Sequence, residues 1–224
     1  MRRTYRAVGT ILLLALPLLA GGVLAQPDPR AQLEQLLLTQ EELIETLEDD
    51  GWVIKTVDRL DPEPEGGVSV VATYANPNSS LSLVIGLIQF ESRELLDRFV
   101  GAILEAPQLQ GPPRDLLEEA RENPEALPEL LQQEAERVLL LALERDQLQL
   151  LLQRHTLLAF LRLGQQAPGV LAAADRTALL LRVGGRQLQK VLDVCADLAA
   201  RAEAGEIPPE QIPPYCAPLE AGSQ

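Results

Sequence analysis

The chain has 224 residues and a formal net charge of −14, with one histidine and two cysteines. A surface this acidic repels phosphate backbones and anionic lipid heads, so nucleic-acid binding and peripheral membrane binding are disfavoured. Zinc sites usually draw on several His and Cys ligands, which this composition does not supply. We therefore expect no metal and no cofactor.

Residues 1–25 have the layout of a secretory signal peptide. A basic head is followed by an apolar core at residues 11–20 and by Val-Leu-Ala just before Gln26. The apolar core is short for a membrane span of about 20 residues. We expect cleavage after Ala25, with an uncleaved anchor as the alternative. Cleavage removes three arginines and no acid, so the charge of the mature chain is −17. That chain would have no stable membrane anchor and would be secreted or periplasmic.

Residues 26–106 form the first predicted half. Thr39 can cap a helix and Glu42 can complete a capping box, after which Gly51 is expected to end that helix. Three apolar, β-branched runs follow at 52–60, 68–74 and 81–90.

Turn-forming residues separate these runs, which favours antiparallel strands. Apolar residues then recur at helical spacing over 95–104 until Pro107. The predicted order is helix, three strands, helix. Residues 107–113 are rich in proline and glycine and are expected to be a linker.

The second predicted half spans residues 114–204. Short helices are expected at Arg114–Glu122 and Pro128–Glu134, before the leucine-rich stretch 138–164. Charged residues break that stretch, which excludes a membrane span. They divide it into VLLLAL, LQLLLQ and TLLAFLRLG, each of strand length, with a turn at Arg154-His155. A long buried helical hairpin is the main alternative and would make this half all-α.

An apolar run at 179–183 is expected to be interrupted by Gly184-Gly185, and a helical stripe then continues to about Gly205. The fold class is therefore predicted as α+β. It would contain two similar halves, each with one or more helices, antiparallel strands and a further helix, joined by the proline-rich linker. The halves share an order of elements and not aligned residues.

Residues 205–224 form a proline-rich tail. Cys195 and Cys216 are an even pair, which in an exported protein favours a disulfide. In the chain-entropy model, closing a loop of about 20 residues stabilises a fold by roughly 3 kcal/mol. The bond would attach the tail to the preceding helix, and the prolines should keep the tail extended and non-helical.

Catalytic equipment is sparse. A serine hydrolase needs a nucleophile, a base and an orienting acid, yet His155 is the only histidine and no Gly-x-Ser-x-Gly motif occurs. We expect His155 to be a turn or core-edge residue.

Carboxylates are abundant, so a hydrolase that uses carboxylates alone is the catalytic alternative. The main clusters are Glu48-Asp49-Asp50 and the group Asp58, Asp61, Glu63 and Glu65. Neither has the spacing of a calcium loop. Few aromatic residues are present to line a carbohydrate cleft.

Trp52 directly follows Gly51 at the start of the first predicted strand. We expect it to pack the helix against the sheet, while a contact with a partner is the functional alternative. These patterns favour an exported, non-catalytic module of the cell envelope or medium. Its partner would be a protein or a small apolar ligand, held on a sheet face or in a leucine-lined groove.

Overall fold

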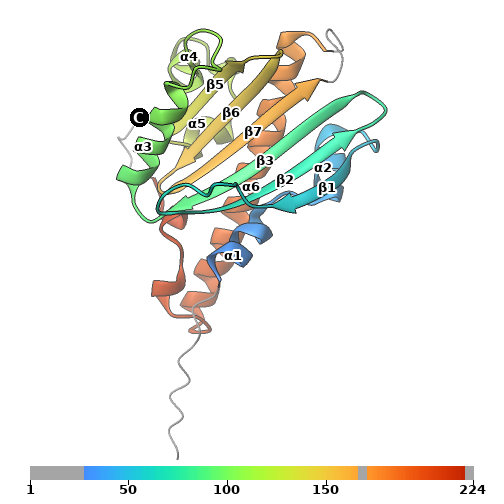
Figure 1. The fold of residues 1–224 in the computed structure, drawn as a ribbon. Helices are drawn as coiled ribbons and strands as arrows, with labels where there is room; N and C mark the ends of the chain where they lie inside the picture. Colours follow the sequence, from blue (N-terminus) through green and yellow to red (C-terminus); the bar gives the residue numbers. More distant parts are fainter. Residues whose placement is uncertain (1–27, 166–170, 220–224) are drawn as a thin grey trace, which may run out of the picture.

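Helices and one antiparallel sheet make up the computed structural model, which describes residues 28–165 and 171–219 (Figure 1). The sheet has seven strands in the order β1-β2-β3-β7-β6-β5-β4. The predicted α+β class is therefore confirmed. The predicted signal peptide lies outside the described residues. The strands are β1 (Val53–Asp58), β2 (Gly67–Asn76), β3 (Leu81–Phe90), β4 (Arg114–Asp115), β5 (Arg137–Leu143), β6 (Gln147–Arg154) and β7 (Leu157–Gln165).

Helices cover the two faces of the sheet unequally (Figure 1). The α-helices are α1 (Pro29–Leu36), α2 (Gln40–Leu47), α3 (Arg93–Leu104), α4 (Leu116–Glu122), α5 (Glu129–Glu134) and α6 (Ala173–Glu203). Side chains of α1, α2, α4, α5 and α6 pack with one face of the sheet in the larger apolar core. The α3 helix covers part of the other face, over a smaller core.

The N-terminal cap of α2 is the one that the sequence predicts. The Thr39 hydroxyl accepts from the Glu42 backbone N–H at 3.2 Å, and the Glu42 carboxylate accepts from the Thr39 N–H at 2.7 Å. The predicted end at Gly51 is wrong. The helix ends at Leu47, because Glu48 adopts the left-handed conformation (φ 53°) that stops the helix without a glycine.

The leucine-rich stretch 138–164 consists of strands and not of a helical hairpin. β5, β6 and β7 form consecutive antiparallel pairs, and β7 also pairs with β3 from Leu81↔Gln165 to Gln89↔Leu157. This central β3–β7 pair makes one sheet from the strands of both predicted halves. The turn between β6 and β7 is His155–Thr156, one residue later than predicted, because Arg154 still pairs with Leu157.

The predicted linker lies against the sheet. Leu109 forms an isolated antiparallel bridge with Leu143, and the Gln110 N–H donates to the Ala142 carbonyl at 2.8 Å. The segment therefore returns from α3 along the edge of β5. This path places Leu109 beside the smaller core.

The expected interruption at Gly184-Gly185 does not occur, because α6 continues through both residues. A Cβ atom at Gly184 would lie 2.8 Å from the Leu150 side chain, whereas at Gly185 it would meet open space. Gly184 therefore allows the helix to approach β6 closely. Within the described residues, no helix is both long enough and apolar enough to cross a membrane.

Candidate functional site

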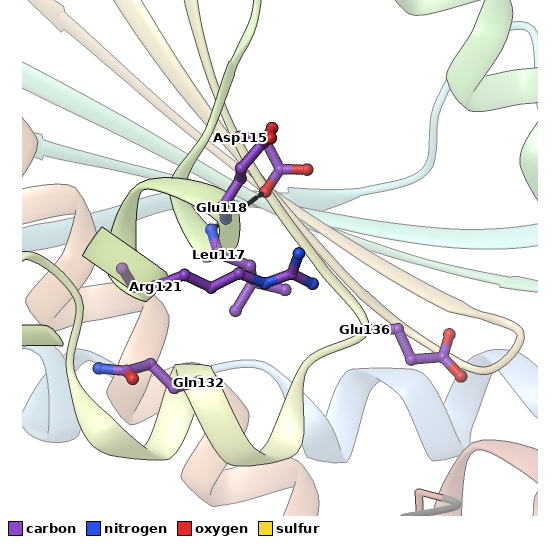
Figure 2. A pocket seen from close by; sticks show the side chains of 7 residues that line it. Asp115, Leu117, Glu118, Arg121, Gln132 and Glu136 are labelled. Carbon is purple, nitrogen blue, oxygen red and sulfur yellow. Dashed lines mark hydrogen bonds between the residues drawn. The ribbon is translucent and has the colours of Figure 1, made fainter. Parts of the chain in front are cut away.

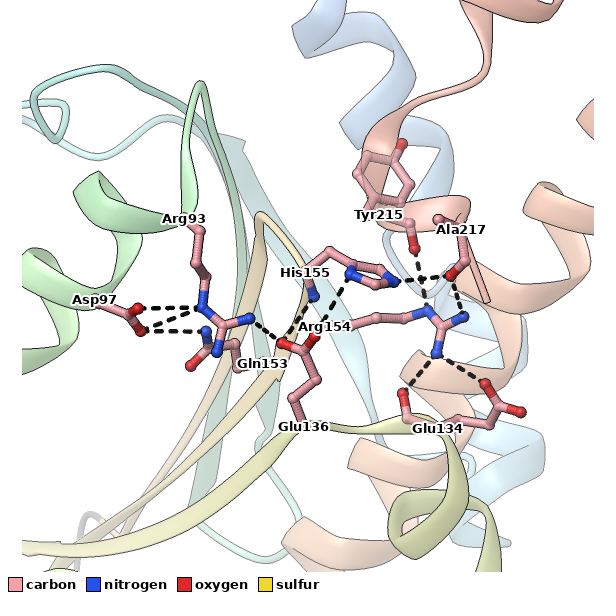
Figure 3. Close-up of polar contacts among 9 residues, drawn as sticks. All are labelled: Arg93, Asp97, Glu134, Glu136, Gln153, Arg154, His155, Tyr215 and Ala217. Carbon is pink, nitrogen blue, oxygen red and sulfur yellow. Dashed lines mark hydrogen bonds and ion pairs between the residues drawn. The ribbon is translucent and has the colours of Figure 1, made fainter. Parts of the chain in front are cut away.

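Arg154 is the most buried cation of the β6–β7 hairpin, with 4% of the residue exposed (Figure 3). Its guanidinium donates to the carbonyl oxygens of Tyr215 and Ala217, each at 3.0 Å. It also donates to the Glu134 carbonyl at 2.9 Å and pairs with the Glu134 carboxylate at 2.8 Å. Because these acceptors satisfy a buried charge, Arg154 joins the hairpin, α5 and the tail.

His155 belongs to the same network. Its Nε2 donates to the Ala217 carbonyl at 2.9 Å, and its Nδ1 lies 3.4 Å from a carboxylate oxygen of Glu136 (Figure 3). Glu136 also pairs with Arg93 of α3. Among the described residues, no hydroxyl or thiol forms a hydrogen bond with this imidazole. The arrangement supports a structural role for His155 at a turn.

The disulfide joins Cys195 of α6 to Cys216 of the tail, with the two Cα atoms 5.2 Å apart. The tail is less extended than predicted, because it contains short 3-10 turns at Pro209–Gln211 and Pro214–Cys216. Proline fits the first position of such turns, where its missing N–H is not needed. Tyr215 is buried, and this burial raises its pKa to about 12.

A polar hollow of about 350 Å³ lies between α4 and the start of β5 (Figure 2). Asp115, Glu118, Arg121 and Glu136 are among its lining residues. Asp115 accepts from two backbone N–H groups as the N-cap of α4, and Glu136 pairs with Arg93. Two of its acids therefore already hold the fold together.

The two predicted carboxylate clusters make structural hydrogen bonds. Asp49 accepts from the Asn76 amide at 2.6 Å, and Glu63 pairs with Arg30 at 2.7 Å. The Ser69 backbone N–H, together with Arg30, lowers the pKa of Glu63. Within the described residues, no group of three or more His, Cys, Asp or Glu side chains is arranged to hold a metal ion.

Trp52 lies in the larger core with 1% of its surface exposed. This position agrees with the packing role expected for it. Trp52 also borders a hollow that Asp49 and Leu179 line, and a contact with a partner there stays a prediction.

A second cavity, of about 160 Å³, lies between α3 and the uncovered part of the sheet, and we call it the α3 cavity. Most of its wall is apolar, which distinguishes it from the polar hollow beside α4. The apolar lining residues are Leu60, Phe99, Ile103, Ala106, Leu109, Leu143 and Phe160, and the polar ones are Gln108, Gln149 and Arg162.

The close fit of Phe160 against Gly86 forms part of this wall. A Cβ atom at Gly86 would lie 2.1 Å from the Phe160 ring, so the ring occupies the space above a strand residue that has no side chain. Glycine in a strand interior often marks such a close approach. Phe160 is consequently 9% exposed although it faces the cavity.

Reasoning from the sequence missed both Arg162 and the α3 cavity. The available signal was the alternation in TLLAFLRLG, which places Arg162 on the same sheet face as Leu158 and Phe160. A cation on an apolar strand face is unusual enough to mark the position. The loop and helix residues that complete the cavity had no such pattern.

Comparisons of the chain with protein-family models, with curated proteins and with solved structures found no match. The fold and the two hollows are therefore the basis for inferring a function.

Proposed function

We propose that the mature chain is an exported, non-catalytic binding module that holds a small apolar ligand in the α3 cavity. The observation that carries this proposal is the apolar wall of a cavity that stays open between α3 and the sheet. Ligand sites are usually apolar concavities with a few polar groups that fix orientation. The polar network around Arg154, by contrast, uses its hydrogen-bonding groups within the fold.

Two features support export in this proposal. Residues 1–25 have the composition of a signal peptide, and Cys195 is bonded to Cys216. Structural disulfides are typical of oxidising compartments outside the cytoplasm. The proposal also includes the two similar halves, whose strand sets β1-β2-β3 and β5-β6-β7 meet at the β3–β7 pair.

Native mass spectrometry of the protein purified from the medium or envelope of its own host tests the proposal. We expect a chain that begins at Gln26, contains the disulfide and carries a small molecule as added mass. A chain that still begins at Met1 would contradict export. A bare mature chain, or one bound only to another protein, would contradict ligand binding.

Matched tryptophan variants connect the retained mass with the cavity. A106W places a large ring in the wall of the α3 cavity, so we expect the retained molecule to be lost. A178W places the same ring on an exposed part of α6, beside a different hollow, and should retain it. Equal retention by both variants would contradict binding in this cavity.

A further inference from the structure

The lining of the α3 cavity carries a positive charge, whereas the molecule as a whole is strongly negative. Arg162 is the one charged residue in its lining. Four other hollows of the described chain each contain an acidic residue in their lining, for example Asp115, Asp49, Glu206 and Glu210. In a chain with 33 acidic residues, a lining with a cation and no acid is distinctive.

Arg162 has no ionic partner among the described residues. Its Nε donates to the Gln149 side-chain oxygen at 2.9 Å, whereas neither Nη atom forms a hydrogen bond with a described residue. Partial burial lowers the pKa of Arg162, although the guanidinium stays charged at neutral pH. Arg154, eight positions earlier, pairs instead with Glu134.

Gln149 fixes the direction of this cation. Gln149 and Arg162 are opposite each other in the β6–β7 register, and Gln149 is 4% exposed. Because the buried amide holds Nε, the two Nη groups are left for another acceptor. A guanidinium binds a carboxylate through two parallel hydrogen bonds, which makes a carboxylate its best-matched small anion.

We propose that the α3 cavity binds a small monocarboxylate whose apolar group enters the cavity while its carboxylate pairs with Arg162. This inference rests on the proposed function, because it specifies the ligand of the same cavity. An apolar cavity of about 150 Å³ accommodates a benzene ring. The α3 cavity, at about 160 Å³, therefore suits a phenyl ring or a short alkyl chain.

Calorimetric titration of the purified mature chain with 3-phenylpropionate and with 3-phenylpropan-1-ol tests the inference. The two probes share the ring and the linker and differ in the carboxylate. A hydrogen-bonded ion pair favours the acid, and we expect it to bind about tenfold more tightly than the alcohol. R162Q should abolish the preference for the acid over the alcohol.

R182Q is the matched control, because Arg182 is also exposed and unpaired among the described residues but borders a different hollow. It should retain the preference for the acid. Equal affinity of the wild-type chain for both probes would overturn the carboxylate inference. It would still support binding of an apolar ligand in the α3 cavity. Binding of neither probe would overturn the inference together with ligand binding in this cavity. If R182Q loses the preference for the acid to the same extent as R162Q, the preference depends on the overall charge of the protein. That result would overturn the role of Arg162.

Discussion

Two arginines on the β6–β7 hairpin have opposite surroundings. Arg154 is buried, and carbonyl oxygens together with Glu134 satisfy its guanidinium. Arg162 borders an apolar cavity and is held only by Gln149 among the described residues. The same residue type thus stabilises the fold at one end of the hairpin and offers unused donors at the other.

The two adjacent glycines of α6, Gly184 and Gly185, differ in how much space a side chain would have. A Cβ atom at Gly184 would lie 2.8 Å from the Leu150 side chain and 3.2 Å from the Leu152 side chain. A Cβ atom at Gly185 would meet open space. Alanine is favoured over glycine in a helix interior by about 0.8–1 kcal/mol. That gain is available at Gly185, whereas overpacking offsets it at Gly184.

We expect G185A to raise the free energy of unfolding by about 0.5–1 kcal/mol. G184A should lower it by about 1 kcal/mol, because the added methyl group must displace buried leucine side chains. Urea unfolding followed by circular dichroism measures both variants. Equal stabilisation by the two substitutions would show that α6 does not need a glycine to approach β6.

At the scale of elements, α6 holds the junction between α1 and α2. Gln187 is fully buried and donates to the Leu36 carbonyl at 2.6 Å. Lys190 donates to the Leu37 carbonyl at 2.7 Å and pairs with Glu42 at 2.5 Å. Elements about 150 residues apart in the chain are therefore joined by polar contacts beside the larger core.

The ion pair between Glu42 and Lys190 should make this junction sensitive to acid. Burial raises the pKa of Glu42, but hydrogen bonds from Lys190 and the Thr39 N–H outweigh this effect, and the net pKa is below the ordinary 4.5. A carboxyl group whose pKa is lowered by folding stabilises the fold above its unfolded pKa, and the contribution is lost as pH falls through the folded value.

We therefore expect E42Q to be less stable than the wild type at pH 6, with a difference that shrinks below about pH 4.5. Glutamine can still complete the capping box, so the change isolates the charge. E45Q, on the exposed side of α2, is the control and should have little effect at either pH. Urea unfolding at pH 6 and pH 3.5 gives the comparison, and a pH-independent difference for E42Q would contradict the ion-pair contribution.

Most elements could be predicted from the sequence, because their signals are local. The capping box at Thr39, the strand at 81–90 and the three short segments of 138–164 each depend on residues close together in the chain. The end of α2 could not, because Glu48 takes the left-handed conformation although it is not a glycine. The continuity of α6 could not, because Gly184 lies against β6 inside the helix instead of ending it. The α3 cavity could not be predicted either, since its wall combines two loop segments, a helix and three strands.

For the whole molecule, the unequal covering of the sheet is the main functional feature. Five helices close one face over the larger core, whereas α3 covers only part of the other. Beyond α3, Val71, Thr73 and Val84 on the second face are half-buried. The α3 cavity lies at this boundary between the covered and the open sheet.

Methyl NMR of the mature chain titrated with 3-phenylpropan-1-ol tests binding in the α3 cavity most directly. We expect saturable shifts of the Ile103, Leu109 and Leu143 methyl groups, which line the cavity. The Leu171 and Leu179 methyl groups, beside another hollow, should not move, and A106W should abolish the response. Shifts that are absent, or that are equally large at Leu171 and Leu179, would contradict a specific ligand site beneath α3.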